Sequence, residues 1–160
     1  MKELGKLFEN TLMDIYYAEN QILKALPKLA QKAKSPELKK AFQTHLTQTE
    51  GQVKRLDRIF QILGKPPKAV KCEAITGILK ECDEVVEDFG DSTALDAGMI
   101  AAAQTVEHYE MARYGALRTW AEELGMKDAA KLLEETLLEE RGTDQLLTKL
   151  AEAKVNLKAA

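Results

Sequence analysis

The sequence predicts an all-α protein, folded as one domain (residues 1–160) into a four-helix bundle with a long crossover that carries an extra short helix. Apolar residues recur every three or four positions in four long segments, which places them on one face of an α-helix. The two halves of the chain also align without a gap, so that Glu19 falls on Glu110 and Leu26 on Leu117. Two helix hairpins related by such a repeat favour a bundle with pseudo-twofold symmetry.

The first hairpin is predicted from helices over residues 2–34 and 36–63. Pro27 lies inside the first helix and predicts a kink or weakened last turns. Ser35 and Pro36 have the residue types that begin a helix, serine as N-cap and proline at the first helical position. Because the turn between the two helices is so short, we expect them to be antiparallel.

The connection to the second half is too long for a hairpin turn. It contains a segment with one apolar side, which predicts a short helix over residues 73–89. Ser92 is expected to cap the third long helix, over 93–124, and the fourth follows over 127–153. The C-terminal tail VNLKAA is expected to be frayed.

Composition and charge exclude several classes of protein. The net charge of −3 and the mixing of basic with acidic residues argue against a nucleic-acid partner. No apolar run approaches the roughly 20 residues that span a bilayer. Acidic residues recur in the first thirty positions, unlike a secretory signal. We therefore expect a soluble cytoplasmic protein, with no membrane partner. Cys72 and Cys82 match no zinc-ligand spacing and are expected to be reduced thiols.

Polar side chains interrupt the apolar faces at one level of the predicted bundle. Glu107 and Glu110 stand three residues apart on the apolar face of the third long helix. Two carboxylates in a core repel each other and lose hydration unless a cation compensates them. The other long helices place further donors at the same level. These are Glu19, His45, Glu140 and, beside the inner row, Asp144.

Five carboxylates and one imidazole favour iron or manganese over zinc, which prefers nitrogen and sulfur in closed four-coordinate sites. The repeat places Glu19 opposite Glu110, an arrangement in which carboxylates bridge a pair of metal ions. The hypothesis is a site for two metal ions bridged by Glu19 and Glu110. The terminal ligands would be Glu107, Glu140, Asp144 and His45.

Each candidate taken alone has a simpler explanation. An isolated inward glutamate can reflect a misjudged helix rotation, and His45 alone is more typical of a hydrogen-bonded core histidine. His108 is expected to point sideways, near the site or at an interface, and Glu139 to lie in an exposed charge run. Three tyrosines are placed either to bond the carboxylates or to pack in the core: Tyr16, Tyr109 and Tyr114. The six candidates together favour a metal site.

Four stretches carry a resemblance to known proteins. They are YYAENQ at 16–21, HLTQTEGQ at 45–52, VEHYE at 106–110, and Glu139-Glu140 with Thr143-Asp144. The chain resembles the ferritin-like di-iron bundle proteins, rubrerythrin among them, and more closely the bacterial YciF-like stress proteins (DUF892), over nearly its whole length. The resemblance implies a ferritin-like fold, a dimetal carboxylate site, a homodimer and a link to stress responses, with no established reaction.

Two departures distinguish the chain from rubrerythrin-type proteins. Glu107, Glu110 and Glu140 reproduce their spacing, but Asp144 stands where the fourth helix of those proteins has histidine. The second helix has Thr49 and Gln52 where a glutamate is expected, and Glu50 would be a ligand only if it rotated inward.

Two functions remain open at this point. The first is a dimetal protein, with iron preferred over manganese or zinc, that reacts with peroxide or oxygen in bacterial stress protection. It would need an external electron donor, because the chain lacks a rubredoxin-like cysteine quartet. The second is a non-enzymatic, dimeric structural or stress-interaction protein. Its metal site would be vestigial or would only stabilise the fold.

Overall fold

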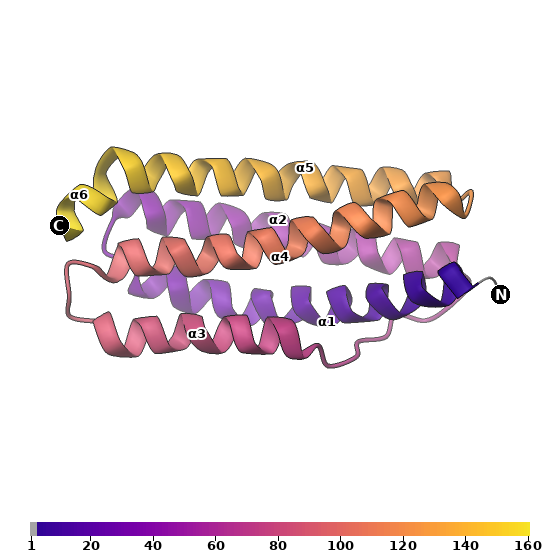
Figure 1. Ribbon diagram of the computed structural model, residues 1–160, viewed down its shortest axis with the longest axis horizontal. Coiled ribbons are helices and arrows are strands. Elements are labelled where there is room, and N and C mark those ends of the chain that lie inside the picture. Colours follow the sequence, from indigo (N-terminus) through magenta and orange to yellow (C-terminus); the bar gives the residue numbers. More distant parts are fainter. Residues whose placement is uncertain (1–2) are drawn as a thin grey trace.

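The structure, a computed structural model, describes residues 3–160 and is helical over most of that range (Figure 1). Four long helices run along the long axis of the molecule, as the sequence predicts. The elements are α1 (Glu3–Lys32), α2 (Pro36–Ile62), α3 (Glu73–Phe89), α4 (Leu95–Glu123), α5 (Lys127–Leu150), a π-helical turn (Ala151–Val155) and α6 (Asn156–Ala159).

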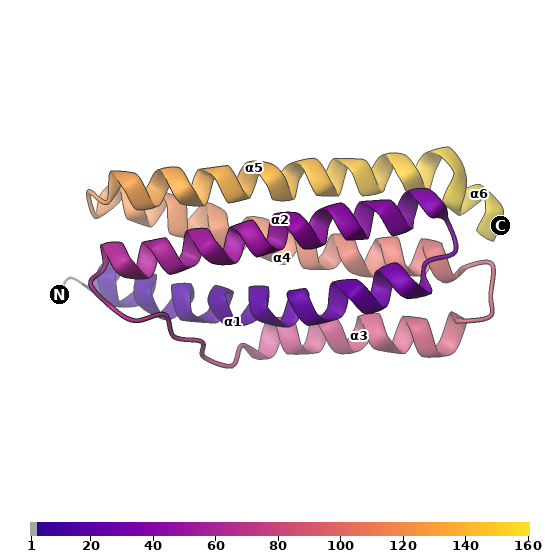
Figure 2. The same cartoon turned by 180° about the vertical axis from the view of Figure 1, so that it is seen from behind.

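The four long helices form two antiparallel hairpins that pack side by side. One hairpin is α1 with α2, the other is α4 with α5, and contacts between α2 and α5 and between α1 and α4 close the bundle. The crossover runs back along the bundle, and its helix α3 lies outside, against α4 and α1 (Figures 1 and 2). The packing of α3 on α4 is close at Gly98, where an added Cβ would lie 2.7 Å from Val85 Cγ1.

Most predicted helix boundaries are met to within two residues, but α5 ends at Leu150 rather than at residue 153, where a π-helical turn takes over. Helix α1 continues past Pro27 to Lys32, and Pro27 lies on its exposed side. Helix α4 begins at Leu95 rather than at residue 93, because Ser92 caps the preceding turn, where its hydroxyl accepts a hydrogen bond from the Ala94 N–H at 3.0 Å. Ser35 is the N-cap of α2, as predicted, and accepts from the Leu38 N–H. Residue 2, predicted to be helical, lies outside the described residues.

The C-terminal tail differs from the prediction of a frayed end. After α5 the chain passes through the π-helical turn into α6. Val155 in that turn is buried, and the Lys154 ammonium lies 2.9 Å from a carboxylate oxygen of Glu37 at the start of α2. Burial of one apolar side chain and this ion pair hold the turn against the bundle, which a sequence pattern as short as this one does not reveal.

The core consists of the apolar faces of all four long helices, closed on one side by α3. Within residues 3–160 no helix combines the length and the apolar character needed to cross a bilayer. At mid-length, the inner faces of the helices change from apolar to polar while staying buried. The core at this level is therefore not held together by apolar packing alone.

One buried carboxylate ties the second hairpin to the first. Asp96 on α4 accepts hydrogen bonds from the backbone N–H groups of Lys34, at 2.8 Å, and Ser35, at 2.6 Å. These donors lie in the turn between α1 and α2, so the carboxylate ties the backbone of that turn to α4 through two charge-assisted hydrogen bonds.

Replacing Asp96 by asparagine is expected to lower the free energy of unfolding by about 1.5–3 kcal/mol, the usual range for hydrogen bonds to a charged group. The amide keeps one acceptor oxygen but turns an NH₂ donor toward a backbone donor. Urea denaturation measures the loss. Asp91→Asn, at an exposed position in the loop before α4, is the matched control. Equal midpoints for the two variants would contradict this role for Asp96.

Candidate metal centre

Four ligand groups converge in the middle of the bundle. His45 comes from α2, Glu107 and Glu110 from α4, and Glu140 from α5, and each contributes one donor atom to a group in which all atoms lie within 4.8 Å of one another. All four residues are at most 4% exposed. The group is therefore a compact, water-excluded cluster of one imidazole and three carboxylates.

The cluster follows from helix periodicity and hairpin geometry. Glu107 and Glu110 are three residues apart and share one face of α4, between the buried residues Ala103 and Tyr114. Glu140 lies on the inner face of the antiparallel partner α5, and His45 on that of α2. The apolar residues above and below fix the rotation of each helix, so the polar residues face the interior of the bundle.

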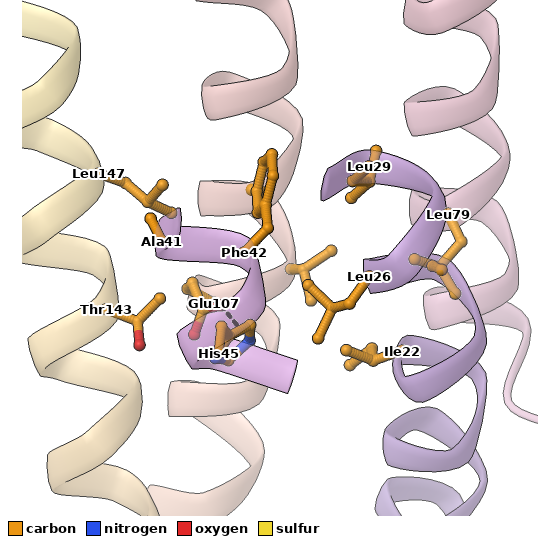
Figure 3. Close-up of a pocket in the computed structure, with 13 residues that line it drawn as sticks. Ile22, Leu26, Leu29, Ala41, Phe42, His45, Leu79, Glu107, Thr143 and Leu147 are labelled. Atoms are coloured by element: carbon orange, nitrogen blue, oxygen red, sulfur yellow. Dashed lines mark ion pairs between the residues drawn. The ribbon is translucent and has the colours of Figure 1, made fainter. Parts of the chain in front are cut away.

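His45 and Glu107 are in direct contact at one edge of the cluster (Figure 3). The imidazole Nε2 lies 2.8 Å from Glu107 Oε1, but the contact lacks the alignment of a hydrogen bond, and both ring nitrogens are without hydrogen-bond partners in the described chain. Adjacent ligands about 2.0–2.1 Å from one metal ion lie about 2.9 Å apart at a right angle. The spacing is compatible with two ligands to one ion, as it is with an ion pair.

Glu19, the predicted bridging ligand from α1, lies beside the cluster and is completely buried. The hydroxyl of Tyr114 donates a 2.5 Å hydrogen bond to Glu19 Oε1, whereas Oε2 has no hydrogen-bond partner among the described residues. The negative charge of Glu19, when ionised, raises the pKa values of Glu110 and Glu107, which places Glu19 within electrostatic reach of both.

The sixth predicted ligand, Asp144, lies away from the cluster. Its carboxylate contacts the exposed His108, with Nε2 and Oδ1 3.1 Å apart, and it accepts a hydrogen bond from the Gln104 amide. His108 therefore points sideways, as expected. Glu50 is exposed, and Thr49, buried on the inner face of α2, donates to the backbone carbonyl of His45.

Burial dominates the electrostatics of the cluster. Loss of hydration, and then the negative charge of Glu140, raise the pKa of Glu19 to about 8. Loss of hydration raises the pKa of Glu107 to about 7. The same effect raises the pKa values of Glu110 and Glu140 well above their ordinary value, reinforced for Glu110 by the charges of its neighbours. Each carboxyl without a counterion therefore favours its neutral form.

The carboxylates of the cluster have no lysine or arginine side chain as a partner among the described residues. Both oxygens of Glu110, both of Glu140 and one each of Glu19 and Glu107 have no hydrogen-bond partner in residues 3–160. The ion pairs of the described residues include none between these four carboxylates and a lysine or arginine; Arg55 contacts Glu139 and Glu135 instead. A set of carboxylates with one imidazole suits iron or manganese.

Sequence reasoning missed the network behind Glu140. Glu139 does not belong to an exposed charge run: Arg55 donates to both of its carboxylate oxygens, at 2.6 and 2.9 Å, and the Gln52 amide donates to one of them at 3.0 Å. Partial burial raises the pKa of Glu139, but the hydrogen bonds from Arg55 and Gln52 lower it overall. This network joins α2 to α5 next to a ligand. Arg55 lies three residues after Gln52, a spacing that was available as a signal.

The other two tyrosines bond elsewhere. Tyr16 donates to Asp57 at 2.9 Å, and the Tyr109 hydroxyl lies 3.1 Å from the Cys72 sulfur. Both cysteines are free and buried, as expected of reduced thiols. Of the three tyrosines, therefore, Tyr114 is the one that contacts a candidate ligand.

Comparison with known proteins gives consistent relationships. The chain is 46% identical to protein YciF of Escherichia coli, over 99% of this chain and 96% of that protein. The crystal structure of the E. coli stress protein YciF superposes with a TM-score of 0.92, at 46% identity, over 98% of this chain and 99% of that one.

Two further solved structures share the fold. The protein YcfI of Rhodopseudomonas palustris has a TM-score of 0.89 at 45% identity, over 92% of this chain and 94% of that one. A protein of Xanthomonas campestris has a TM-score of 0.76 at 21% identity, over 98% and 95%, and shows the fold alone. The model of a domain of unknown function, DUF892, matches residues 3–160. The chain therefore belongs to the DUF892 family of YciF-like stress proteins.

Proposed function

We propose that this protein binds redox-active metal, iron in the first place, at the buried carboxylate cluster and uses it to reduce peroxide or dioxygen during stress. The observation that carries the proposal is the set of unpartnered, fully buried carboxylate oxygens around His45. Such oxygens are costly to bury without a cation.

A pair of divalent ions is the complement that matches the charge. Glu19, Glu107, Glu110 and Glu140 carry four negative charges when ionised, which two divalent ions would neutralise. His45, Glu107, Glu110 and Glu140 would hold the first ion. Glu19 lies beside Glu110 and would serve the second, with Glu110 shared. Asp144 would join only if it turned away from His108.

A reduced iron pair would supply two electrons, which together with two protons convert hydrogen peroxide to water. The protein's own residues keep bulk water out and hold protons nearby. The buried Tyr114 hydroxyl donates to Glu19, so a proton is held at that oxygen pair next to the cluster. The reductant would come from outside the chain.

The sequence prediction of a homodimer in the cytoplasm stays part of this proposal. The E. coli relative is described as a stress protein, which supports a protective role.

The inner face of α2 favours a second candidate function. Thr49 and Gln52 occupy inner positions at which a carboxylate would complete a symmetric metal site. The Thr49 hydroxyl instead donates a hydrogen bond to the backbone carbonyl of His45. A structural role has been suggested for the R. palustris relative. In this alternative, metal stabilises the bundle without turnover. Bound metal that raises the melting temperature but never changes oxidation state would favour it.

Glu110→Gln is expected to abolish metal binding, because it removes one charge and one shared ligand while preserving side-chain shape. Plasma mass spectrometry on protein purified without chelator measures the metal bound per chain. We expect a pair of ions in the natural chain, with iron predominant, and none held tightly in the variant.

Glu50→Gln is the matched control for that experiment, since Glu50 is exposed on α2. It should keep the full metal content and so also exclude an inward rotation of Glu50. Metal that persists in Glu110→Gln, or a natural chain that binds none after reconstitution with ferrous iron, would show that the proposed function is wrong.

The metal-free protein is expected to lose stability as pH rises from about 4.5 to about 8. The pKa of Glu107 is raised from 4.5 to about 7 and that of Glu19 to about 8, so the folded state retains protons that the unfolded state has released. The contribution of these two groups to the free energy of unfolding is therefore fully present below pH 4.5 and is lost as pH rises through their folded-state pKa values. Thermal melts in chelator at several pH values measure this slope.

Bound divalent metal should reverse that slope, because metal displaces the protons and binds better as pH rises. Glu19→Gln in chelator should flatten the slope of the metal-free protein, since it removes one of the titrating groups. A metal-free melting temperature that stays level between pH 5 and pH 8 would contradict burial of unpaired carboxyls.

A further inference from the structure

An internal pocket adjoins the cluster on the side of His45 and Glu107 (Figure 3). Its walls are side chains of all five long elements, including Leu26 of α1, Phe42 of α2 and Leu147 of α5. The polar end of the pocket is thus the edge of the candidate metal centre, and the rest is hydrocarbon.

The pocket is small. The space open to the centre of a water-sized sphere is about 20 Å³, and about 10–15 Å³ is needed to hold one water molecule. One molecule of a few atoms therefore fits. An organic substrate does not fit, which separates the pocket from an ordinary substrate-binding site.

Apart from the end formed by His45 and Glu107, the walls offer almost no hydrogen bonds. The hydroxyl of Thr143, one of the few polar groups in the lining, donates to Gln48 at 3.2 Å. Apolar cavities of this kind stay dry and take up uncharged, weakly hydrated molecules such as xenon. Hydrogen peroxide, which carries two O–H donors, would lose its hydrogen bonds to water on the way to His45 and Glu107. Dioxygen has none to lose.

The pocket shares part of its wall with a groove at the surface. This wider groove between α1 and α3, of about 560 Å³ by the same measure, opens beside Lys24. The groove and the pocket share three lining residues: Ala25, Leu29 and Leu79. These residues lie between the two spaces, and Leu79 lies on the crossover helix α3, as Figure 3 shows.

We propose that the apolar pocket is the dioxygen-access path to the metal centre, with Ala25, Leu29 and Leu79 as its neck. Oxidation of bound metal by dioxygen that arrives along this path rests on the proposed function. Binding of dioxygen in the pocket does not, because it requires no metal. The crossover helix then has a specific role, because it supplies the outer wall of the path. The path favours dioxygen over peroxide as the oxidant that reaches the centre through it.

Occupancy is tested on the full, metal-free chain with dioxygen itself as the probe. Dioxygen is paramagnetic, so NMR under oxygen pressure should enhance methyl relaxation at Leu26 and Val106, which line the pocket. Leu12 and Leu133 are the matched controls, since both are completely buried but lie outside the pocket lining. Equal enhancement at the two sets, or none at the pocket methyls, would overturn the proposal, whatever the metal content.

The path is tested by closing the neck. Leu79→Trp adds bulk at the neck, and Ala25→Leu adds less bulk at a half-buried position that tolerates it better. Each should abolish the enhancement at Leu26 and Val106. Ile78→Trp, at the neighbouring position that lines neither cavity, should retain it.

Iron-loaded protein gives the second measurement. At equal iron content, the neck variants should oxidise ferrous iron several-fold more slowly with dioxygen, while oxidation by hydrogen peroxide stays unchanged. Equal slowing with both oxidants, or no slowing in variants that have lost the relaxation enhancement, would overturn the path. Failure to bind iron at all would instead count against the proposed function and leave the relaxation result to stand alone.

Discussion

The burial of Glu19, Glu107, Glu110 and Glu140 in one cross-section is the constraint on which the rest of the structure depends. Four carboxylates at most 1% exposed, without a lysine or arginine paired to them in the described chain, are unfavourable in any ionised state that lacks a cation. The apolar layers on either side stabilise the bundle strongly enough to hold this polar layer in place.

The residues around the cluster limit how these carboxylates can move. Tyr114 fixes one oxygen of Glu19, and Asp96 holds the turn between α1 and α2 against α4. The ion pair between Arg55 and Glu139 joins α2 to α5 beside Glu140. Each contact joins two helices that carry different ligands. The ligand positions are therefore set by interhelical contacts rather than by any single helix, as pre-organised metal sites require.

The sequence was sufficient for the fold and for most of the candidate site. Helical periodicity placed Glu19, His45 and Glu140 on inner faces because apolar neighbours fix the rotation of each helix. It failed for Asp144, which lies beside the inner row. There a rotation of a few tens of degrees decides between the cluster and the surface, and a contact with His108 takes the carboxylate outward. The apolar pocket could not be predicted from the sequence either, because a cavity depends on how side chains from several helices pack together.

The pseudo-symmetry of the bundle is broken in a way that has chemical consequences. Glu107 and Glu140 in the second half correspond to Tyr16 and Thr49 in the first, and Tyr16 turns to Asp57 on the same hairpin. A metal pair would thus be ligated unequally, with the richer set of carboxylates on α4 and α5. The poorer half supplies Leu26 and much of the apolar wall of the pocket. The pocket nevertheless ends at His45 and Glu107, so it opens toward the position with the larger set of ligands, and the oxidant-access side of the centre and its ligand-poor side are different sides.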